Sequence, residues 1–249
     1  MLDKQPRQVG LSLLFACGDR PSAGDIERVI STADSAAAAA CVSYRPPEEA
    51  EGMVELLASG LTFDLRGLYP ASAMPLPPKR HRYGTIDEMP GALEAITLVP
   101  SHHTSSGFAM IPVVQAMAAL AADIALPLGT VAVCWHPAQS WMAPQYFSRI
   151  ALSWISGGPF PALGLAALQE NSNGLRTEGL GFFIAQELQL DGLAGEPRQE
   201  IAKRAVRLID LAVYQGGFHA DGLIEGPDGL SLAVEIRDAG KLARLRPLA

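Results

Sequence analysis

The sequence has little positive charge and no long apolar run, and each absence excludes a class of partner. Its 249 residues include 19 lysines and arginines against 26 aspartates and glutamates, which gives a formal net charge of -7. Nucleic acids attract basic surfaces, so we expect no nucleic-acid partner. Pro112 and Asp123 interrupt the longest apolar stretch, whereas a membrane-spanning helix needs roughly 18 to 20 apolar residues. We therefore expect no membrane partner.

Cysteine is also scarce. Lys4 and Arg7 precede an apolar stretch at 9–16, an order that fits either a short signal sequence or a buried first strand. The stretch is short for a signal, and Phe15 is bulky where small residues are usual, which favours the strand. No disulfide framework and no CxxC pair can form from Cys17, Cys41 and Cys134. The sequence predicts a reduced, cytoplasmic protein.

Motifs that mark cofactor and metal sites are missing. The chain has no HExxH, CxxC or GxSxG motif and no Walker lysine. Gly174, Gly179 and Gly181 lack the GxGxxG spacing, and a strand is predicted after them where a nucleotide site needs a helix. We expect neither a cofactor nor a metal.

Apolar residues make up 49% of the chain, enough for a core, and their periodicity predicts alternating elements. Before residue 69 we expect strand, helix, strand, helix and strand at 9–16, 22–34, 40–44, 48–57 and 61–68. A proline-rich stretch follows. The pattern then restarts, after a short helix near 86–94, with strand 94–100, helix 108–125, strand 129–136 and helix 143–156. Strands at 160–170 and 179–192, a helix at 196–217 and a hairpin at 222–238 complete it.

Both halves begin with the order strand, helix, strand, helix, strand. We predict an α+β protein of two α/β subdomains with ferredoxin-like βαβ element order, packed together, with antiparallel or mixed sheets. Residues 1–68 form the N-terminal subdomain, 69–92 a proline-rich connector and 93–249 the C-terminal subdomain. A doubly wound parallel sheet is disfavoured, because no phosphate-binding loop follows the first strand and short turns join the later strands.

Candidate catalytic residues lie near predicted strand ends. His102 and His103 are adjacent, so in an extended chain they point opposite ways and only one can face a cleft. A metal would need that histidine with His136, His219 and perhaps Cys134, and nothing in the spacing supports such a set. Glu178 and Glu187 are nine apart, on opposite faces of an ideal strand. The catalytic candidates are His103, His136 and Glu178.

Aromatic residues concentrate between 135 and 154, where all three tryptophans lie. Trp135 is expected in the core. Trp141 and Met142 are predicted on a loop before a helix, and aromatic residues and methionine are frequent at the centres of protein contacts. We therefore select Trp141 and Met142 as partner-binding candidates, with packing of the loop onto its own domain as the alternative.

Four segments together resemble an uncharacterised bacterial family, a domain of unknown function. They are VAVCWHPAQSWMAPQYF at 131–147, RTEGLGFFIAQELQL at 176–190, HADGLIEG at 219–226 and the connector AMPLPP at 73–78. The sequence departs from the family pattern around His102 and His103. The resemblance implies a cytoplasmic α+β protein without an established activity, in a family some of whose members are encoded near immunity or secretion-associated genes.

Two hypotheses remain. The first is a non-enzymatic protein-binding module, immunity-like or secretion-accessory, whose partner is another protein or a second copy of the chain. The alternative is a hydrolase-type enzyme that uses His103 or His136, with or without a metal.

Overall fold

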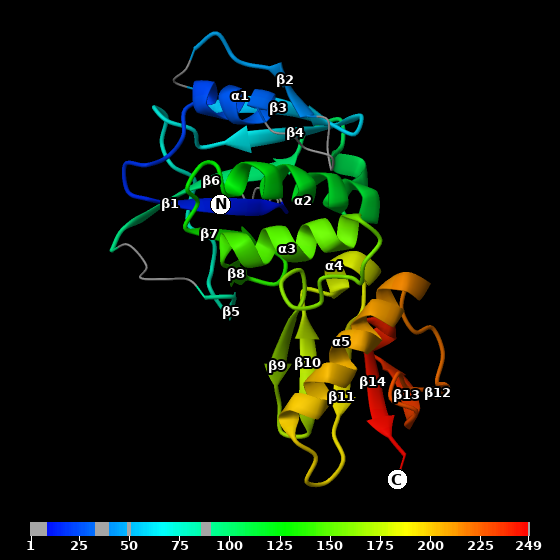
Figure 1. Ribbon diagram of the computed structural model, residues 1–249. Coiled ribbons are helices and arrows are strands. Elements are labelled where there is room, and N and C mark those ends of the chain that lie inside the picture. The colour runs from blue at the N-terminus through cyan, green and yellow to red at the C-terminus, as the bar shows by residue number, and fades with distance from the viewer. Residues whose placement is uncertain (1–8, 33–39, 49–50, 86–90, 249) are drawn as a thin grey trace, which may run out of the picture. The chain divides into compact units, whose positions relative to one another are not determined.

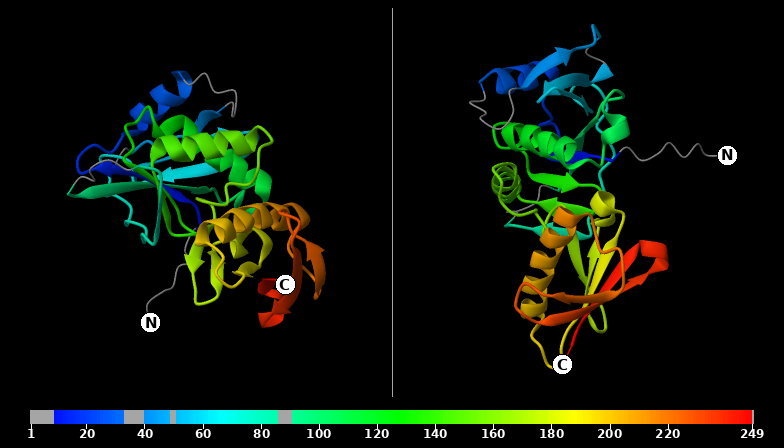
Figure 2. Two further views of the ribbon diagram at one scale, coloured as in Figure 1. Left: turned by 60° about the horizontal axis from the view of Figure 1, so that its bottom comes forward. Right: turned by 90° about the vertical axis from the view of Figure 1, so that its right-hand side faces the viewer.

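A computed structural model describes residues 9–32, 40–48, 51–85 and 91–248 of the chain (Figures 1 and 2). The chain divides into two compact units, Met1–Gly158 and Pro159–Ala249. Each unit has one mixed sheet, and five α-helices accompany the two sheets in the described residues. The α+β class predicted from the sequence is confirmed.

The sheet of the first unit has eight described strands in the order β2-β3-β4-β6-β1-β7-β8-β5. All neighbours are antiparallel except β5 and β8. The strands are β1 (Leu11–Ala16), β2 (Ala40–Tyr44), β3 (Met53–Ala58), β4 (Leu61–Arg66), β5 (His81–Tyr83), β6 (Leu93–Pro100), β7 (Ala132–Trp135) and β8 (Ser140–Met142). The predicted first strand, β1, is confirmed, and it lies inside the sheet between β6 and β7.

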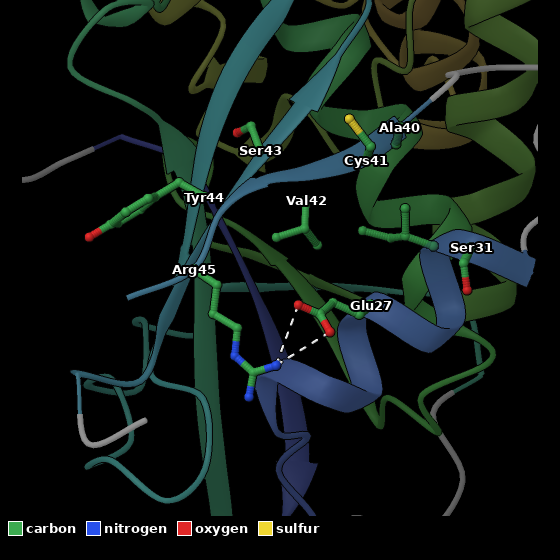
Figure 3. A pocket seen from close by; sticks show the side chains of 9 residues that line it. Glu27, Ser31, Ala40, Cys41, Val42, Ser43, Tyr44 and Arg45 are labelled. Atoms are coloured by element: carbon green, nitrogen blue, oxygen red, sulfur yellow. Dashed lines mark hydrogen bonds and ion pairs between the residues drawn. The ribbon is translucent and has the colours of Figure 1, made fainter. Parts of the chain in front are cut away.

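Three helices belong to this unit: α1 (Ala23–Thr32), α2 (Ile111–Ala125) and α3 (Pro144–Ile155). The amide of Asp25 donates to Oγ of Ser22, which caps α1, and the carboxylate of Asp25 accepts hydrogen bonds from the amide and hydroxyl of Ser22. These bonds lower the pKa of Asp25. Helices α2 and α3 lie side by side over the sheet (Figure 1), and α1 lies next to the edge strand β2 (Figure 3).

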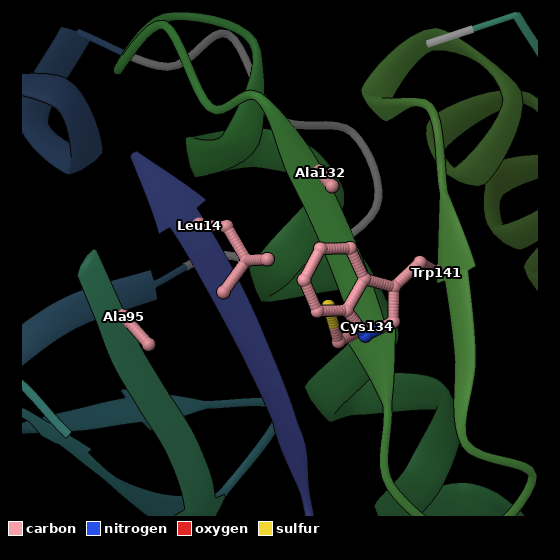
Figure 4. Close-up of a cluster of buried hydrophobic side chains, with 5 residues drawn as sticks. All are labelled: Leu14, Ala95, Ala132, Cys134 and Trp141. Atoms are coloured by element: carbon pink, nitrogen blue, oxygen red, sulfur yellow. The ribbon is translucent and has the colours of Figure 1, made fainter. Parts of the chain in front are cut away.

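One cluster of apolar side chains projects from neighbouring strands on a single face of this sheet (Figure 4). Register explains the cluster: Leu14 of β1 stands opposite Ala95 of β6 and Ala132 of β7, and Cys134 stands opposite Trp141. Burial raises the pKa of the Cys134 thiol well above its usual range. This thiol is therefore a core side chain.

The second unit has six described strands in the order β12-β13-β14-β11-β10-β9, with β11 and β14 parallel. The elements are β9 (Ala167–Glu170), β10 (Gly174–Glu178), α4 (Gly181–Ile184), β11 (Glu187–Asp191), α5 (Arg198–Gln215), β12 (Gly222–Glu225), β13 (Ser231–Arg237) and β14 (Leu242–Pro247). The long helix and the hairpin predicted from the sequence are confirmed. Helix α5 ends at Gly216, whose φ of 79° is left-handed and favours glycine.

An ion triad around the buried Arg204 connects α5 to its surroundings. Arg204 has 4% of its side chain exposed and contacts Glu196 and Asp228, each at 2.5 Å. The hydrogen bond from Arg204 lowers the pKa of Glu196. Burial alone would raise the pKa of Asp228, but the hydrogen bonds from Arg204 and from the amide of Leu230 outweigh it and lower that pKa. The triad joins the loop before α5 to the β12–β13 hairpin.

The unit boundary differs from the predicted one. Strand β6 pairs with β4 and β1, so segments on both sides of the predicted connector at 69–92 share one sheet. The connector itself contributes β5, and the amide of Met74 donates to the carbonyl of Ala95 at 2.9 Å. Proline marks a break in regular structure, but long-range strand pairing decides where a unit ends.

Element order also differs from the prediction. Residues 53–57, predicted as part of the helix 48–57, belong to β3 (Met53–Ala58), in which alternate side chains are buried, so the ferredoxin-like order is not found in the first unit. The strand predicted at 179–192 is divided into α4 and β11, with the left-handed Ala185 (φ 56°) between them. Residues 86–90 of another predicted helix lie outside the described residues.

Candidate functional site

The loop after β6 carries two of the predicted histidines on its exposed side. Its buried residues are Ser101 and Thr104, and both hydrogen-bond to Thr62 at the start of β4. His102 and His103 are exposed and pack edge to face, with ring centroids 5.8 Å apart. The hydrogen bonds of Ser101 and Thr104 hold the loop against the sheet, and the imidazoles of His102 and His103 face solvent.

His136 takes part in a polar contact that the sequence analysis missed. It follows β7, and its Nε2 lies 2.8 Å from Oγ of Ser12 on β1. Ser12 Oγ also lies 2.9 Å from Oγ1 of Thr97 on β6. Ser12 is the one polar residue of the apolar strand β1, and a polar residue in such a strand indicates a buried hydrogen-bond partner. Its partners are 85 and 124 residues away in the sequence, so the pattern could not identify them.

The distance between Ser12 and His136 is that of a nucleophile and its general base. The Ser12 side chain, however, is only 1% exposed, and Thr97 is also buried. A nucleophile must reach the atom that it attacks, and Ser12 Oγ is closed off from a substrate in this conformation. The contact as it stands links three neighbouring strands of the sheet through their side chains.

Glu178 and Glu187 lie at the facing ends of two neighbouring strands. Glu178 ends β10, and Glu187 begins β11. The carboxylate of Glu187 accepts hydrogen bonds from the hydroxyl of Thr177 at 2.5 Å and from the amides of Gly179 and Gly181 at 3.0 and 2.9 Å. Glu187 therefore organises the turn between β10 and α4.

The predicted partner-binding residues need correction. Trp141 is 5% exposed and Met142 is fully buried, because both lie on β8, inside the sheet between β7 and β5. The indole N–H of Trp141 donates to the carbonyl of Pro78 at 3.2 Å, and the ammonium group of Lys79 lies 5.1 Å from the ring centroid. The proline-rich segment covers Trp141, so neither side chain is an exposed anchor.

His219 belongs to the second unit, where it lines a cavity of about 470 Å³ beside β12 and the end of α5. Among the described residues, no three histidine, cysteine, aspartate or glutamate side chains form a group that could hold a metal ion.

A groove follows the free edge of the first sheet. β2 is the outermost strand, and residues 40–45 line a cavity of about 410 Å³ together with Glu27, Ile30 and Ser31 of α1 (Figure 3). Successive side chains of a strand point to opposite faces, so a cavity on one face alone would be lined by alternate residues. This cavity is lined by six consecutive residues and therefore runs along the strand. Figure 3 shows Val42 and Arg45 pointing toward α1. The groove is therefore bounded by a helix on one side and a strand edge on the other.

The edge of β2 has none of the charges that usually block strand pairing. Its residues 40–44 are Ala, Cys, Val, Ser and Tyr. The other outermost described strands each carry a charged residue, namely Arg82 in β5, Glu170 in β9 and Glu225 in β12. Charged side chains on an edge strand discourage the addition of a further strand. Of these four described edge strands, β2 is the one without a charged residue, and a register shift between Val42 and Tyr44 interrupts its ladder with β3.

One ion pair crosses the groove. Nη1 of Arg45 lies 3.3 and 3.4 Å from the carboxylate oxygens of Glu27, and the two side chains are 35% and 42% exposed. On the other side of β2, the hydroxyl of Ser43 donates to the carboxylate of Glu55 at 2.8 Å. An exposed pair such as Glu27 and Arg45 contributes at most about 1 kcal/mol and can rearrange.

Within the described residues, no helix has both the length and the apolar character required to cross a membrane. Comparison of the chain with protein-family models, curated proteins and solved structures found no match in any of the three.

Proposed function

We propose that this chain is a non-enzymatic protein-binding module that takes up an extended segment of its partner along β2. The observation that carries the proposal is the groove of about 410 Å³ beside an edge strand without charged residues. The cytoplasmic location belongs to the same proposal and rests on the three scattered cysteines and on the family resemblance. The bacterial origin and the immunity-like or secretion-accessory role rest on the resemblance alone.

Strand addition explains why an edge and a groove together make a binding site. An edge strand has backbone N–H and C=O groups directed away from the sheet, and an extended peptide can satisfy them in a new ladder. The ladder supplies affinity for any extended segment. Side chains of the peptide that point toward α1 enter the groove, where their shape and charge supply specificity.

The test uses the full chain and peptides selected from a random display library. We expect selected peptides to slow amide hydrogen exchange at residues 40–45. Val42→Lys introduces a long charged side chain into the groove and is expected to weaken binding by at least about tenfold, equal to about 1.4 kcal/mol. The matched control is Leu223→Lys on β12, where Leu223 is 70% exposed, and it should leave binding unchanged. Protection outside the β2 edge, or no selected peptide at all, would contradict the proposal.

A hydrolase is the second candidate, because the Ser12–His136 distance of 2.8 Å matches a nucleophile and its base. It requires a conformation that exposes Ser12. A fluorophosphonate probe should then label the chain at Ser12, and Ser12→Ala should abolish both labelling and ester hydrolysis. Absence of label at Ser12 in the folded protein removes this candidate and leaves the Ser12 contact as a structural one.

A further inference from the structure

We infer that the β2 groove selects an extended segment in which an apolar residue and a lysine or arginine lie two positions apart. Glu27 is the residue that binds the basic side chain. This inference rests on the proposed function, and it adds the chemistry of the partner and one specificity-determining residue.

The groove has an apolar part and a charged part. Ile30 of α1 is 9% exposed, and Val42 of β2 is half-buried and points toward α1 (Figure 3). Together they offer apolar contact to one side chain of an added strand. Glu27 lies nearly one helical turn before Ile30, next to Arg45, and forms the charged part.

The spacing of the two parts suits alternate residues of a strand. Side chains that share a face of a strand are two residues apart, which is about 6.6 Å along the strand. Glu27 and Ile30 are three residues apart on α1, which is about 4.5 Å along the helix axis, and the side chains of Glu27 and of the peptide's lysine or arginine are long enough to bridge the remainder. A peptide with its apolar residue against Ile30 therefore places the side chain two positions away near Glu27.

Charge around β2 favours a cation in that second position. In the described part of α1 and the β2–β3 segment, the exposed or half-buried acidic side chains are Asp25, Glu27, Glu48, Glu51 and Glu55. The two arginines beside them, Arg28 and Arg45, already contact Asp25 and Glu27. A carboxylate that is 42% exposed can accept a second cation beside Arg45, because the pair holding it is weak.

An anionic side chain in the same position meets the opposite field. It would lie close to the like charge of Glu27. The cation beside it is Arg45, and an ion pair with Arg45 would break the existing pair between Arg45 and Glu27. Charge complementarity of this kind gives specificity through repulsion of the wrong partner as well as attraction of the right one.

The experiment compares three synthetic ten-residue peptides that differ at the two positions that flank a central Val-containing triplet. Each has a Thr-rich host sequence around Lys-Thr-Val-Thr-Lys, Gln-Thr-Val-Thr-Gln or Glu-Thr-Val-Thr-Glu, so that either strand direction places one of these side chains near Glu27, and binding to the full chain is measured by fluorescence anisotropy. We expect the lysine peptide to bind at least about tenfold more tightly than the glutamate peptide. This preference should shrink in 1 M salt, where the Debye length is about 3 Å.

Glu27 variants locate the origin of the preference. Glu27→Gln should reduce the lysine preference to about twofold or less, and Glu27→Lys should reverse it in favour of the glutamate peptide. Glu48→Lys is the control, because it makes the same charge change on an exposed residue outside the groove and should keep the lysine preference. An equal effect of Glu27→Lys and Glu48→Lys would overturn the role of Glu27, because it would show a general field instead of a contact.

The outcomes separate this inference from the proposed function. If all three peptides protect residues 40–45 from exchange and bind equally well, the inference fails and the proposed function stands. If peptides bind elsewhere, or none is bound even after library selection, both fail. Urea unfolding of each variant verifies that the fold is intact, which is expected because Glu27 and Glu48 are not buried.

Discussion

Substitution of Trp141 is the most direct test of the corrected position of this residue. The side chain is 5% exposed, packs in a cluster with Leu14, Ala95, Ala132 and Cys134, and donates its indole N–H to Pro78. Trp141→Ala removes the whole indole from this cluster and leaves the carbonyl of Pro78 without that donor. The change therefore tests both the packing and the hydrogen bond.

The expected magnitude follows from burial. Truncation of a buried tryptophan to alanine costs about 3 to 5 kcal/mol, because it loses the transfer free energy of the ring and leaves a cavity. Trp141→Phe keeps most of the apolar contact but loses the hydrogen bond and some volume, so we expect a cost of about 1 to 2 kcal/mol. Substitution of an exposed surface anchor would change the free energy of unfolding by no more than about 0.5 kcal/mol.

Urea unfolding followed by tryptophan fluorescence measures the free energy of unfolding of the first unit, to which Trp141 belongs. Trp135 and Trp154 remain in the variant, and both belong to the first unit. Met110→Ala is a suitable control, since Met110 is 62% exposed in the same unit and should stay within about 0.5 kcal/mol of the unsubstituted protein. A loss below about 0.5 kcal/mol for Trp141→Ala would refute the reasoning and restore Trp141 as a surface residue.

Two further predictions concern buried ionisable groups. In the folded protein at pH 8, a thiol reagent should label Cys17 and Cys41, which are exposed, but not Cys134, because burial closes access to this thiol and raises its pKa. Labelling of all three before unfolding would contradict the core position of Cys134. Arg204→Met should destabilise the second unit by about 3 kcal/mol at pH 7, measured by amide exchange in α5 at increasing urea. The difference in unfolding free energy between the variant and the unsubstituted protein should persist above about pH 4.3, the ordinary pKa of glutamate. It should disappear as the pH falls through the lowered pKa of Glu196, because the protonated carboxyl is neutral and gains little from Arg204. A difference that grows in acid would contradict this assignment.

Local sequence signals predicted the elements that local interactions determine. The helix predicted at 196–217 is found as α5 (Arg198–Gln215), with an apolar face at helical spacing, Pro197 before its first turn and Gly216 after its last. The helix predicted at 143–156 is found as α3 (Pro144–Ile155), and its first residue can be proline because the N–H that proline lacks has no partner in the first turn of a helix. β1 was evident from its continuous apolar run.

Prediction was wrong where a local signal had two meanings. The acidic residues Glu48 and Glu49 resemble the first turn of a helix, yet Met53–Ala58 pairs with β4 as a strand. Proline at 75–78 indicates irregular backbone, which is correct, but it also suggested a connector between subdomains. The same segment instead lies over the indole of Trp141 and contacts a strand of the first sheet. Periodicity describes neighbours along the chain and contains no information about which strands will pair.

The sequence alone determined the α+β class, the first strand, the long helices and the absence of recognisable cofactor motifs, because each depends on residues close together in the chain. Tertiary structure decided the position of the unit boundary, the burial of Trp141, the contact between Ser12 and His136 and the groove between α1 and β2. These features join residues that are far apart in the sequence or depend on which strand is outermost in a sheet. Strand order is set by the packing of the whole unit, so the edge that carries the proposed binding site became visible only in the fold.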